Sequence, residues 1–592
     1  MSAFGFDHGP ELPAEAAWRP LDRALWRWTR AHGGSPLLAR LAAWAAFADG
    51  EGDAALPLAG GEALRYGLAP LDDARLAALR NEPLLGDGRV PTPFVLDAAG
   101  RFYLWRNHAD ECALATLLGE RLATSAAAPV DEADLDALFP GGDPAAVASQ
   151  REAVRRVGAS RLFVLTGGPG TGKTTTVLRM LLMRLKTLPD ARIAVAAPTG
   201  KAAQRLVQSL RAGRQALLEN RVAPLPETWR ALLDRLPDGE ALTLHRLLGY
   251  DPRRNRYTRD RAHPLAADLV VVDEASMVDL PTLRALLEAL RPEATLILVG
   301  DADQLAPVGI GTVLLDLVVA LEARASPALV RLTHSFRAER PLAAINDAVR
   351  KGEAAALRAA FAAAGHQARW RDVAAGAAYR QALQGWAESL AATLPRPTLP
   401  AADDTAATAQ ALAALRALSR RQLLCALREG PHGAPAVDAW LGRRLKEAWG
   451  VPEDREWYPG RAVLVVRNDY ATRLFNGDVG LCLADADDRL RVWFESTDAD
   501  GRPTARAFAP AALPAHEGAF ALTVHKAQGS EYAHVAVLLP PDPAQRILSR
   551  QLLYTGLSRA KAQVELMAGE AVVAAALARP LYRIGGLRER LA

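Results

Sequence analysis

The stretch FVLTGGPGTGKTTTVLRM, residues 163–180, constrains the fold of this chain more than any other segment. An apolar strand runs into a loop of glycines, and a helix that starts at Lys173 follows. The loop fits the pattern G-x-x-x-x-G-K-T, with Gly167, Gly172, Lys173 and Thr174 in register. Because glycine N–H groups can close around phosphate oxygens at a helix N-terminus, the sequence predicts an α/β protein that binds a nucleoside triphosphate.

The residues of this loop have separate expected parts. The Lys173 ammonium would face the β- and γ-phosphates, and the Thr174 hydroxyl would bind Mg²⁺. We therefore predict a nucleoside triphosphate and Mg²⁺ as cofactors. The expected nucleotide-binding residues are Gly167, Gly168, Pro169, Gly170, Thr171, Gly172, Lys173, Thr174 and Thr175.

Length and composition set outer bounds. A chain of 592 residues, half of them hydrophobic, exceeds a single core and suggests about three to five domains. The formal net charge of +4 permits a polyanionic partner without requiring one. The three cysteines, Cys112, Cys425 and Cys482, show no C-x-x-C spacing. This spacing argues against a zinc site or a disulfide framework and suits a reducing cytoplasm. The sequence shows no signal peptide and no apolar stretch of membrane-spanning length, so we expect a cytoplasmic protein without a membrane partner.

Changes in residue pattern divide the chain into three expected domains. Residues 1–125 combine amphipathic helical stretches with a hairpin that turns at Gly100, and an acidic stretch at 131–144 reads as a linker or domain entry. Residues 126–350 alternate apolar strands and helices, which predicts a parallel sheet covered on both faces. Residues 351–592 contain helices, then short alternating runs at about 461–520 that suggest a small β-barrel, then α/β character again.

A second apolar strand, LVVVDEASMVDL, ends in two acids. Asp273 at the carboxyl end of this strand could hold Mg²⁺, and Glu274 beside it could polarise the attacking water. The alternative is a helix N-terminus that favours acidic residues.

Three further motifs carry polar residues that suit a γ-phosphate. Gln304 follows the strand LILVGD and could sense that phosphate. Arg337 in LTHSFRA and Arg559 in LLYTGLSRAK could stabilise charge that develops in phosphoryl transfer. Either arginine alone would more often form a surface salt bridge.

Together these motifs resemble superfamily 1 DNA helicases of the 5′→3′ branch. The resemblance implies two RecA-like P-loop NTPase lobes in an α/β fold, a helical and β N-terminal domain, and an SH3-like β-barrel inserted in the second lobe. It implies that the nucleotide is ATP, and it places Gln150 at adenine and Glu531 near the ribose. The alternative for Gln150 is an ordinary helix-surface glutamine. It also implies DNA contacts from two groups of residues. These are Thr199, Lys201 and His245 on the first lobe, and Thr523, His525, Lys526 and Gln528 on the second.

The stretches RNDYATRLFNGDVG, RQLLCALREGPHG and RFYLWRNHADE narrow the resemblance to the RecD family, the α subunits of RecBCD enzymes (exodeoxyribonuclease V). This family implies a 5′→3′ helicase that binds the 5′-ended single strand at double-strand DNA ends. It also implies RecB-like and RecC-like partners, with the nuclease site on a partner, in recombinational repair. Gly556 and Ser558 stand where the family often has Ala and Thr. The open alternatives are a stand-alone helicase of the same branch and a DNA-regulated ATPase switch that does not unwind DNA.

Overall fold

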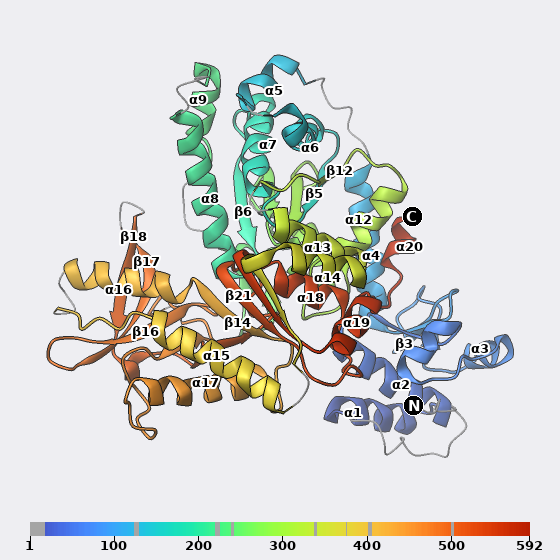
Figure 1. Cartoon of the computed structure of the whole chain (residues 1–592). Helices are drawn as coiled ribbons and strands as arrows, with labels where there is room; N and C mark the ends of the chain where they lie inside the picture. Colours follow the sequence, from blue (N-terminus) through green and yellow to red (C-terminus); the bar gives the residue numbers. More distant parts are fainter. Residues whose placement is uncertain are drawn as a thin grey trace.

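The computed structural model describes residues 18–123, 130–141, 143–219, 225–237, 242–336, 340–373, 376–400, 405–469, 471–498 and 502–592. Two parallel β-sheets with helices on their faces form two α/β lobes (Figure 1). A small antiparallel sheet belongs to the second lobe, and an N-terminal sheet with its own helices lies beside the first. This arrangement confirms the α/β fold that the motifs predict and the two lobes that the family resemblance implies.

The first lobe is built on a six-stranded sheet in which every pairing is parallel. Its order is β12 (Leu329–Leu332), β5 (Leu162–Gly167), β11 (Thr295–Gly300), β10 (Leu269–Val272), β6 (Ile193–Ala197) and β7 (Leu242–Thr243). The central strands β5, β10 and β11 are buried along their whole length, as their continuous apolar sequences predict. Parallel strands end at one edge of the sheet, and this edge therefore gathers the residues after β5, β10 and β11.

Eight helices accompany this sheet in the part of the chain that the structure describes. They are α5 (Glu132–Leu138), α6 (Pro144–Arg156), α7 (Lys173–Thr187), α8 (Gly200–Leu218), α9 (Glu227–Leu233), α10 (Leu244–Leu247), α11 (Leu280–Ala289) and α12 (Val313–Ala323). The acidic stretch expected to be a linker contains α5. Asp131 caps this helix through the N–H of Ala133, and Leu135 and Leu138 are buried in the first-lobe core, so the segment packs as part of the lobe.

The second lobe is built on a five-stranded parallel sheet. Its order is β13 (Ala368–Arg371), β22 (Ala560–Met567), β21 (Tyr532–Leu538), β14 (Arg421–Cys425) and β20 (Ala521–Thr523). Its helices are α13 (Arg340–Lys351), α14 (Ala354–Ala363), α15 (Ala377–Thr393), α16 (Thr405–Leu418), α17 (Ala434–Ala448), α18 (Arg550–Leu557) and α19 (Glu570–Ala578). The stretch RQLLCALREG, which is ambiguous in sequence, forms β14, because strands on both sides bury it.

The alternating runs near 461–520 form a five-stranded antiparallel sheet. Its order is β18 (Pro503–Phe508), β17 (Leu490–Thr497), β16 (Val479–Ala484), β15 (Ala462–Val465) and β19 (His516–Gly518). The Asn476-Gly477 turn precedes β16, with Gly477 at φ +98°. Residues 499–501, between β17 and β18, lie outside the described residues. The small β unit is therefore present, while its closure into an SH3-like barrel stays a prediction.

The N-terminal region packs two helices on a four-stranded sheet. The helices are α1 (Pro20–Ala31) and α2 (Pro36–Gly50), with α3 (Asp73–Leu79) at one side, and the strands follow the order β1 (Ala55–Pro57), β4 (Arg101–Leu104), β3 (Phe94–Leu96) and β2 (Leu85–Gly86). The expected hairpin is β3–β4, and Gly100 at φ +77° makes its turn. The following helix, α4 (Trp105–Leu122), packs against α11 and places Leu114 and Leu118 in the first-lobe core.

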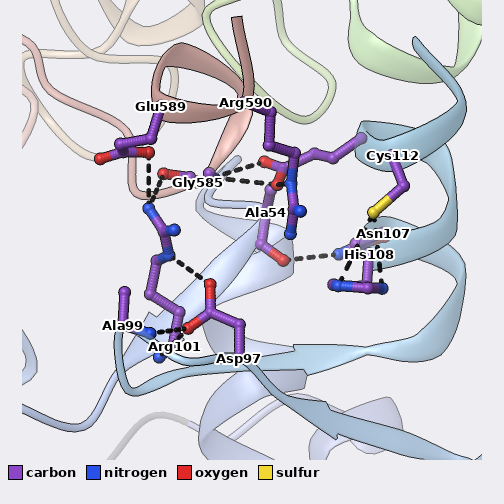
Figure 2. Close-up of polar contacts among 12 residues, drawn as sticks. Ala54, Asp97, Ala99, Arg101, Asn107, His108, Cys112, Gly585, Glu589 and Arg590 are labelled. Carbon is purple, nitrogen blue, oxygen red and sulfur yellow. Dashed lines mark hydrogen bonds and ion pairs between the residues drawn. The ribbon is translucent and has the colours of Figure 1, made fainter. Parts of the chain in front are cut away.

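Residues 582–591, which we call the C-terminal strap, return from the second lobe to the N-terminal region. In Figure 1 the red α20 (Leu587–Leu591) lies against the blue α4. The Ile584 side chain is buried in the N-terminal core, and its carbonyl accepts the N–H groups of Ala54 and Ala55 at 2.8 and 3.2 Å. Figure 2 shows Arg101 of β4 reaching the Gly585 carbonyl at 3.0 Å and the Glu589 carboxylate at 2.7 Å. The sequence gives no sign of this return.

Candidate nucleotide site and lobe junction

The phosphate loop leaves β5 and enters α7 at the carboxyl edge of the first sheet. Gly170 and Gly172 have φ values of +76° and +81°, a backbone region that a glycine adopts without strain. A Cβ on Gly172 would collide with the Gln150 side chain. Lys173 Nζ donates to the carbonyl oxygens of Gly167 and Gly168 at 2.7 and 3.0 Å, so the ammonium lies within the loop. Pro169, Thr171, Thr174 and Thr175 complete the loop and the first turn of α7.

Two side chains flank the helix entry at Gly172. Gln150 of α6 is buried, and its Nε2 donates to the Thr171 carbonyl at 3.0 Å, so it is not the surface glutamine of the alternative interpretation. Phe336 donates its N–H to the Gly170 carbonyl at 2.8 Å, and its ring reaches within 3.7 Å of a Cβ placed on Gly172. With half of its surface exposed, Phe336 offers an aromatic face beside the loop. The motif patterns do not predict Phe336, although it is an aromatic residue directly before the predicted Arg337.

The predicted acid pair lies at the end of β10. Asp273 donates its N–H to the Ala196 carbonyl of β6, and one of its carboxylate oxygens accepts the N–H of Glu274 at 2.9 Å. Burial and the neighbouring Glu274 raise the pKa of Asp273 to about 6, while Lys173 opposes this rise. Glu274 has φ +51°, a left-handed conformation that costs a non-glycine residue energy and that marks functional sites. The alternative of a helix N-terminus fits less well, because a short 3₁₀ turn follows Glu274.

Gln304 and Asp301 lie after β11, next to the phosphate-loop strand. Gln304 Nε2 donates to Asp301 Oδ2 at 3.1 Å, and both side chains are buried. The same Asp301 oxygen accepts the hydroxyl of Tyr554 from α18 of the second lobe at 2.9 Å. One residue further, Thr555 Oγ1 accepts the Leu305 N–H at 2.8 Å. The loop after β11 is therefore the place where the two lobes share hydrogen bonds.

Of the two predicted arginines, Arg559 lies within the described residues and Arg337 does not. Arg559 follows α18 and is buried, and its Nε donates to the Thr555 carbonyl at 3.1 Å. Its Nη2 is buried and has no hydrogen-bond partner among the described residues. A surface salt bridge, the alternative for a lone arginine, is thus excluded for Arg559. Arg337 lies outside the described residues.

The predicted DNA-side residues of the first lobe lie at the start of α8. Thr199 caps this helix by accepting the Ala202 N–H at 3.2 Å. Burial and the nearby Arg205 lower the pKa of Lys201 to about 8. The ring of Phe475, from the small β unit, lies 3.9 Å from a Cβ placed on Gly200. The small β unit therefore reaches the α8 segment.

The second-lobe motif at 522–532 faces α8. Gln528 Nε2 donates to the Leu305 carbonyl at 3.4 Å, and Glu531 pairs with Arg205 of α8 at 2.7 Å. A second ion pair joins Glu531 to Lys561 at 3.4 Å. These contacts make a further bridge between the lobes.

The remaining residues of this motif differ in exposure. Thr523 is buried and accepts the Lys526 N–H at 3.2 Å, whereas the Lys526 side chain is exposed and pairs with Glu517. Burial lowers the pKa of His525, and the Arg583 charge of the C-terminal strap adds to this effect.

His245 of α10 stands apart from the nucleotide loop in an exposed aromatic cluster. Its ring centroid lies 5.3 Å from that of Tyr250 and 5.9 Å from that of Tyr257. These tyrosines come from the hairpin of β8 (Tyr250–Asp251) and β9 (Arg256–Tyr257). Because His245 is exposed, it does not belong to the first-lobe core.

The fold and the site define a P-loop NTPase with two α/β lobes. Two family models match the chain: an AAA domain at residues 150–310 and a UvrD-like helicase C-terminal domain at residues 518–567. The "RecBCD enzyme subunit RecD" of Mycobacterium tuberculosis is 39% identical over 87% of this chain and 84% of that protein. The same subunit of Haemophilus influenzae is 32% identical over 75% of this chain and 72% of that protein. The chain therefore belongs to the RecD family.

Two other similarities cover less of the compared protein or show a lower sequence identity. The "ATP-dependent RecD2 DNA helicase" of Deinococcus radiodurans is 31% identical over 84% of this chain but only 58% of its own length. A crystal structure of Pif1 helicase from Bacteroides, in complex with ADP-AlF3 and single-stranded DNA, aligns with 68% of this chain and 88% of that chain, at 17% identity and a TM-score of 0.33. Within the described ranges, no helix combines the length and apolar character needed to cross a bilayer.

Proposed function

We propose that this chain is the ATP-dependent DNA helicase subunit of a RecBCD-type complex. The observation that carries the proposal is the lobe junction: Tyr554 and Thr555 of the second lobe bond the loop that follows β11, beside the phosphate loop. Nucleotide bound to the first lobe would thus lie where the lobes meet. Closing on ATP and opening after hydrolysis would move one lobe relative to the other along a DNA strand.

The residues of the site fit ATP and Mg²⁺. Gly170 and Gly172 adopt positive φ values and carry no Cβ that would cover the backbone N–H groups of the loop. The Lys173 ammonium already lies inside the loop. Burial first, and the neighbouring Glu274 carboxylate second, raise the pKa of Asp273, and a bound cation would favour its ionised form. In our assignment Thr174 and Asp273 would hold Mg²⁺, which would supply charge neutralisation at the phosphates.

Each polar residue then has one part in hydrolysis. Glu274 would take the proton of the attacking water, and Gln304 would position that water or sense the γ-phosphate. Arg559, with an Nη2 that has no partner among the described residues, would stabilise charge on the transferred group, and Arg337 would act beside it. Gln150 would contact adenine, Phe336 would stack on the base, and Glu531 would approach the ribose on release from Arg205.

The DNA-side assignment rests on the α8 segment, the motif at 522–532 and the aromatic cluster. Lys201, Lys526 and His245 would contact the sugar-phosphate backbone, while stacking on Tyr250 would tolerate any base. The same DNA-binding path would be lined by Thr199, Thr523, His525 and Gln528. We assign the 5′-ended strand and 5′→3′ movement, as the motif resemblance implies.

Partners follow from the family. The relatives are named as subunits of the RecBCD enzyme, so we propose RecB-like and RecC-like partners, with the nuclease on a partner. We also propose domains at residues 1–125, 126–350 and 351–592, with α4 of the first domain adding side chains to the first-lobe core and α13 packing in the second lobe. The β unit at about 461–520 would be folded as an SH3-like barrel. The first of these domains would dock on a RecC-like subunit.

A tailed-duplex assay tests the proposal. The purified chain, alone and with its RecB- and RecC-like partners, is given duplexes with a 5′ tail or a 3′ tail, and both ATP hydrolysis and unwinding are followed. We expect hydrolysis that depends on single-stranded DNA and unwinding from the 5′ tail. Unwinding from the 3′ tail would reject the polarity, and full ATPase activity without DNA would favour the ATPase switch.

The control is Lys173→Gln, which removes the phosphate-facing charge without emptying a core. This variant should bind DNA and lose hydrolysis. Hydrolysis at the wild-type rate would show that the nucleotide site is misassigned. Unwinding by the chain without partners would favour the stand-alone helicase.

A further inference from the structure

We propose that Tyr554 is a positioning residue for ATP hydrolysis, acting through Asp301 to align Gln304 and Arg559 across the lobe junction. The inference rests on the proposed function, because it assumes that ATP is hydrolysed between the lobes. It concerns one hydroxyl group whose bond joins residues 253 positions apart.

The Asp301 carboxylate is the shared acceptor at this junction. Its Oδ2 accepts the Tyr554 hydroxyl at 2.9 Å and the Gln304 Nε2 at 3.1 Å, and its Oδ1 accepts the Asp303 N–H at 3.1 Å. Asp301 is 1% exposed, so water does not compete for these bonds. Two donors on one oxygen hold the Gln304 amide in a fixed orientation relative to the Tyr554 ring.

The second polar atom of the Gln304 amide, Oε1, is available for a further function. Gln304 Oε1 is buried and has no hydrogen-bond partner among the described residues. A buried acceptor without a partner costs free energy, so its retention indicates a role in another state of the site. Losing the bond from Tyr554 would leave the Asp301 carboxylate, and the Gln304 amide bonded to it, less narrowly oriented.

The same tyrosine is tied to Arg559. Tyr554 and Thr555 are neighbours on α18, and the Thr555 carbonyl accepts Arg559 Nε at 3.1 Å. Thr555 also accepts the Leu305 N–H, so α18 grips the β11 loop at two successive residues. The Tyr554 hydroxyl further lies 3.1 Å from a Cβ placed on Gly168 of the phosphate loop. One short segment of α18 therefore meets three parts of the site.

The chemistry of the hydroxyl suits a permanent donor. Burial and the Asp301 carboxylate raise the pKa of Tyr554 well above its ordinary value, so the phenol keeps its proton. A phenylalanine at this position would keep the buried ring and lose this single bond. Asp301 would still accept from Gln304 and Asp303, which makes the variant a test of alignment with little effect on folding.

The test is Tyr554→Phe in the full chain, with its assembled partners where they are needed for stability. We expect kcat for ATP hydrolysis with single-stranded DNA to fall about tenfold, the weight of one hydrogen bond to a charged group. We expect KM for ATP to change less than about twofold, because the phosphate loop itself is untouched. The control is Tyr379→Phe, since Tyr379 also has a buried hydroxyl, in the second lobe, without a partner among the described residues.

A double-mutant cycle separates positioning from packing. Because Tyr554 acts through Asp301, Tyr554→Phe combined with Asp301→Asn should be no slower than Asp301→Asn alone. Additive losses, or a kcat for Tyr554→Phe equal to that of Tyr379→Phe, would overturn the inference. If the wild type hydrolyses ATP without any response to DNA, the proposed helicase function fails, and the comparison of Tyr554→Phe with Tyr379→Phe on the basal rate still decides this inference.

Discussion

At the scale of single residues, Asp273 and Glu274 show how a strand end prepares two neighbouring carboxylates for different tasks. Asp273 is held by its N–H bond to β6 and by the N–H of Glu274, so its position is fixed by the sheet. Glu274 is turned away from the strand by its left-handed backbone. We therefore propose that the first acid holds a cation and that the second accepts a proton.

Glu274→Gln separates these tasks. The amide keeps the size of the side chain but cannot take a proton, so turnover should fall by about 10²- to 10⁴-fold while ATP binding persists. Nucleotide binding by fluorescence titration and single-turnover hydrolysis would measure the two quantities. Equal loss of binding in Glu274→Gln and Lys173→Gln would contradict the assignment.

Arg559→Ala should slow ATP hydrolysis and leave nucleotide affinity almost unchanged, unlike a substitution that weakens nucleotide binding. The guanidinium is needed mainly when charge develops on the transferred group, so kcat should fall about 10³-fold or more with a small change in affinity for a non-hydrolysable ATP analogue. The control is Arg550→Ala, which removes a half-buried arginine of α18 that donates to the Leu577 carbonyl outside the nucleotide site. A variant with weakened analogue binding as its sole defect would remove Arg559 from the catalytic set.

At the scale of elements, the C-terminal strap fixes α4 through a buried carboxylate. Both oxygens of Glu111 accept the Gly586 N–H, at 3.0 and 2.9 Å, and Arg590 lies 3.7 Å away. These partners stabilise the ionised form, yet burial outweighs them and raises the pKa of Glu111 to about 7. The attachment of the strap therefore depends on pH.

The sign of this dependence follows from proton linkage. Between the ordinary pKa of 4.5 and the folded value of about 7, the folded state binds more protons than the unfolded state. Stability from this site is thus present below pH 4.5 and is lost as pH rises to about 7, by roughly 3 kcal/mol in all. Glu111→Gln is neutral at every pH and should lack this loss.

Hydrogen exchange of residues 584–591 measures the effect. After correction for intrinsic exchange, protection in the wild type should fall relative to Glu111→Gln as pH rises from 5 to 8. A constant ratio of protection across this range would show that the Glu111 pKa is not raised. Glu589→Gln, at the exposed pair with Arg101, is the control and should follow the wild type.

At the scale of the whole molecule, the N-terminal region and the first lobe share helix α4. A deletion that ends at residue 125 would remove Leu114, Leu117 and Leu118 from the first-lobe core. Such a truncation would damage the lobe that binds nucleotide, so it cannot isolate partner docking. Substitutions on the exposed face of α1 avoid this problem.

Leu21→Glu tests the docking proposal on that face. Leu21 is 58% exposed, and Trp28, seven residues later on the same face, is 38% exposed. A charge placed in an apolar interface should reduce co-purification with RecB- and RecC-like partners by about tenfold or more, with DNA-stimulated ATPase retained. Leu188→Glu, on the first lobe at 44% exposure, is the control. Unchanged assembly of Leu21→Glu would place the docking surface elsewhere.

How much the sequence predicts depends on whether a feature is local. The phosphate loop, Asp273 and the strand before Gln304 are read from contiguous patterns, and the first sheet confirms each as a local structure. Tyr554 lies inside a quoted motif, but its bond to Asp301 joins distant segments, and no spacing rule reveals it. The packing of the strap on α4 cannot be predicted from the sequence for the same reason, since its short helix shows no pattern that points to α4.

The strap also has a consequence for synthesis on the ribosome. The N-terminal core includes Ile584, and the Ile584 N–H bonds Asp53 across 531 positions of sequence. This core cannot be completed as residues 18–104 emerge, because its last member is translated after both lobes. The N-terminal core of a nascent chain therefore lacks Ile584 for most of translation. A premature stop before codon 584 would leave that core incomplete and accessible to proteases and chaperones.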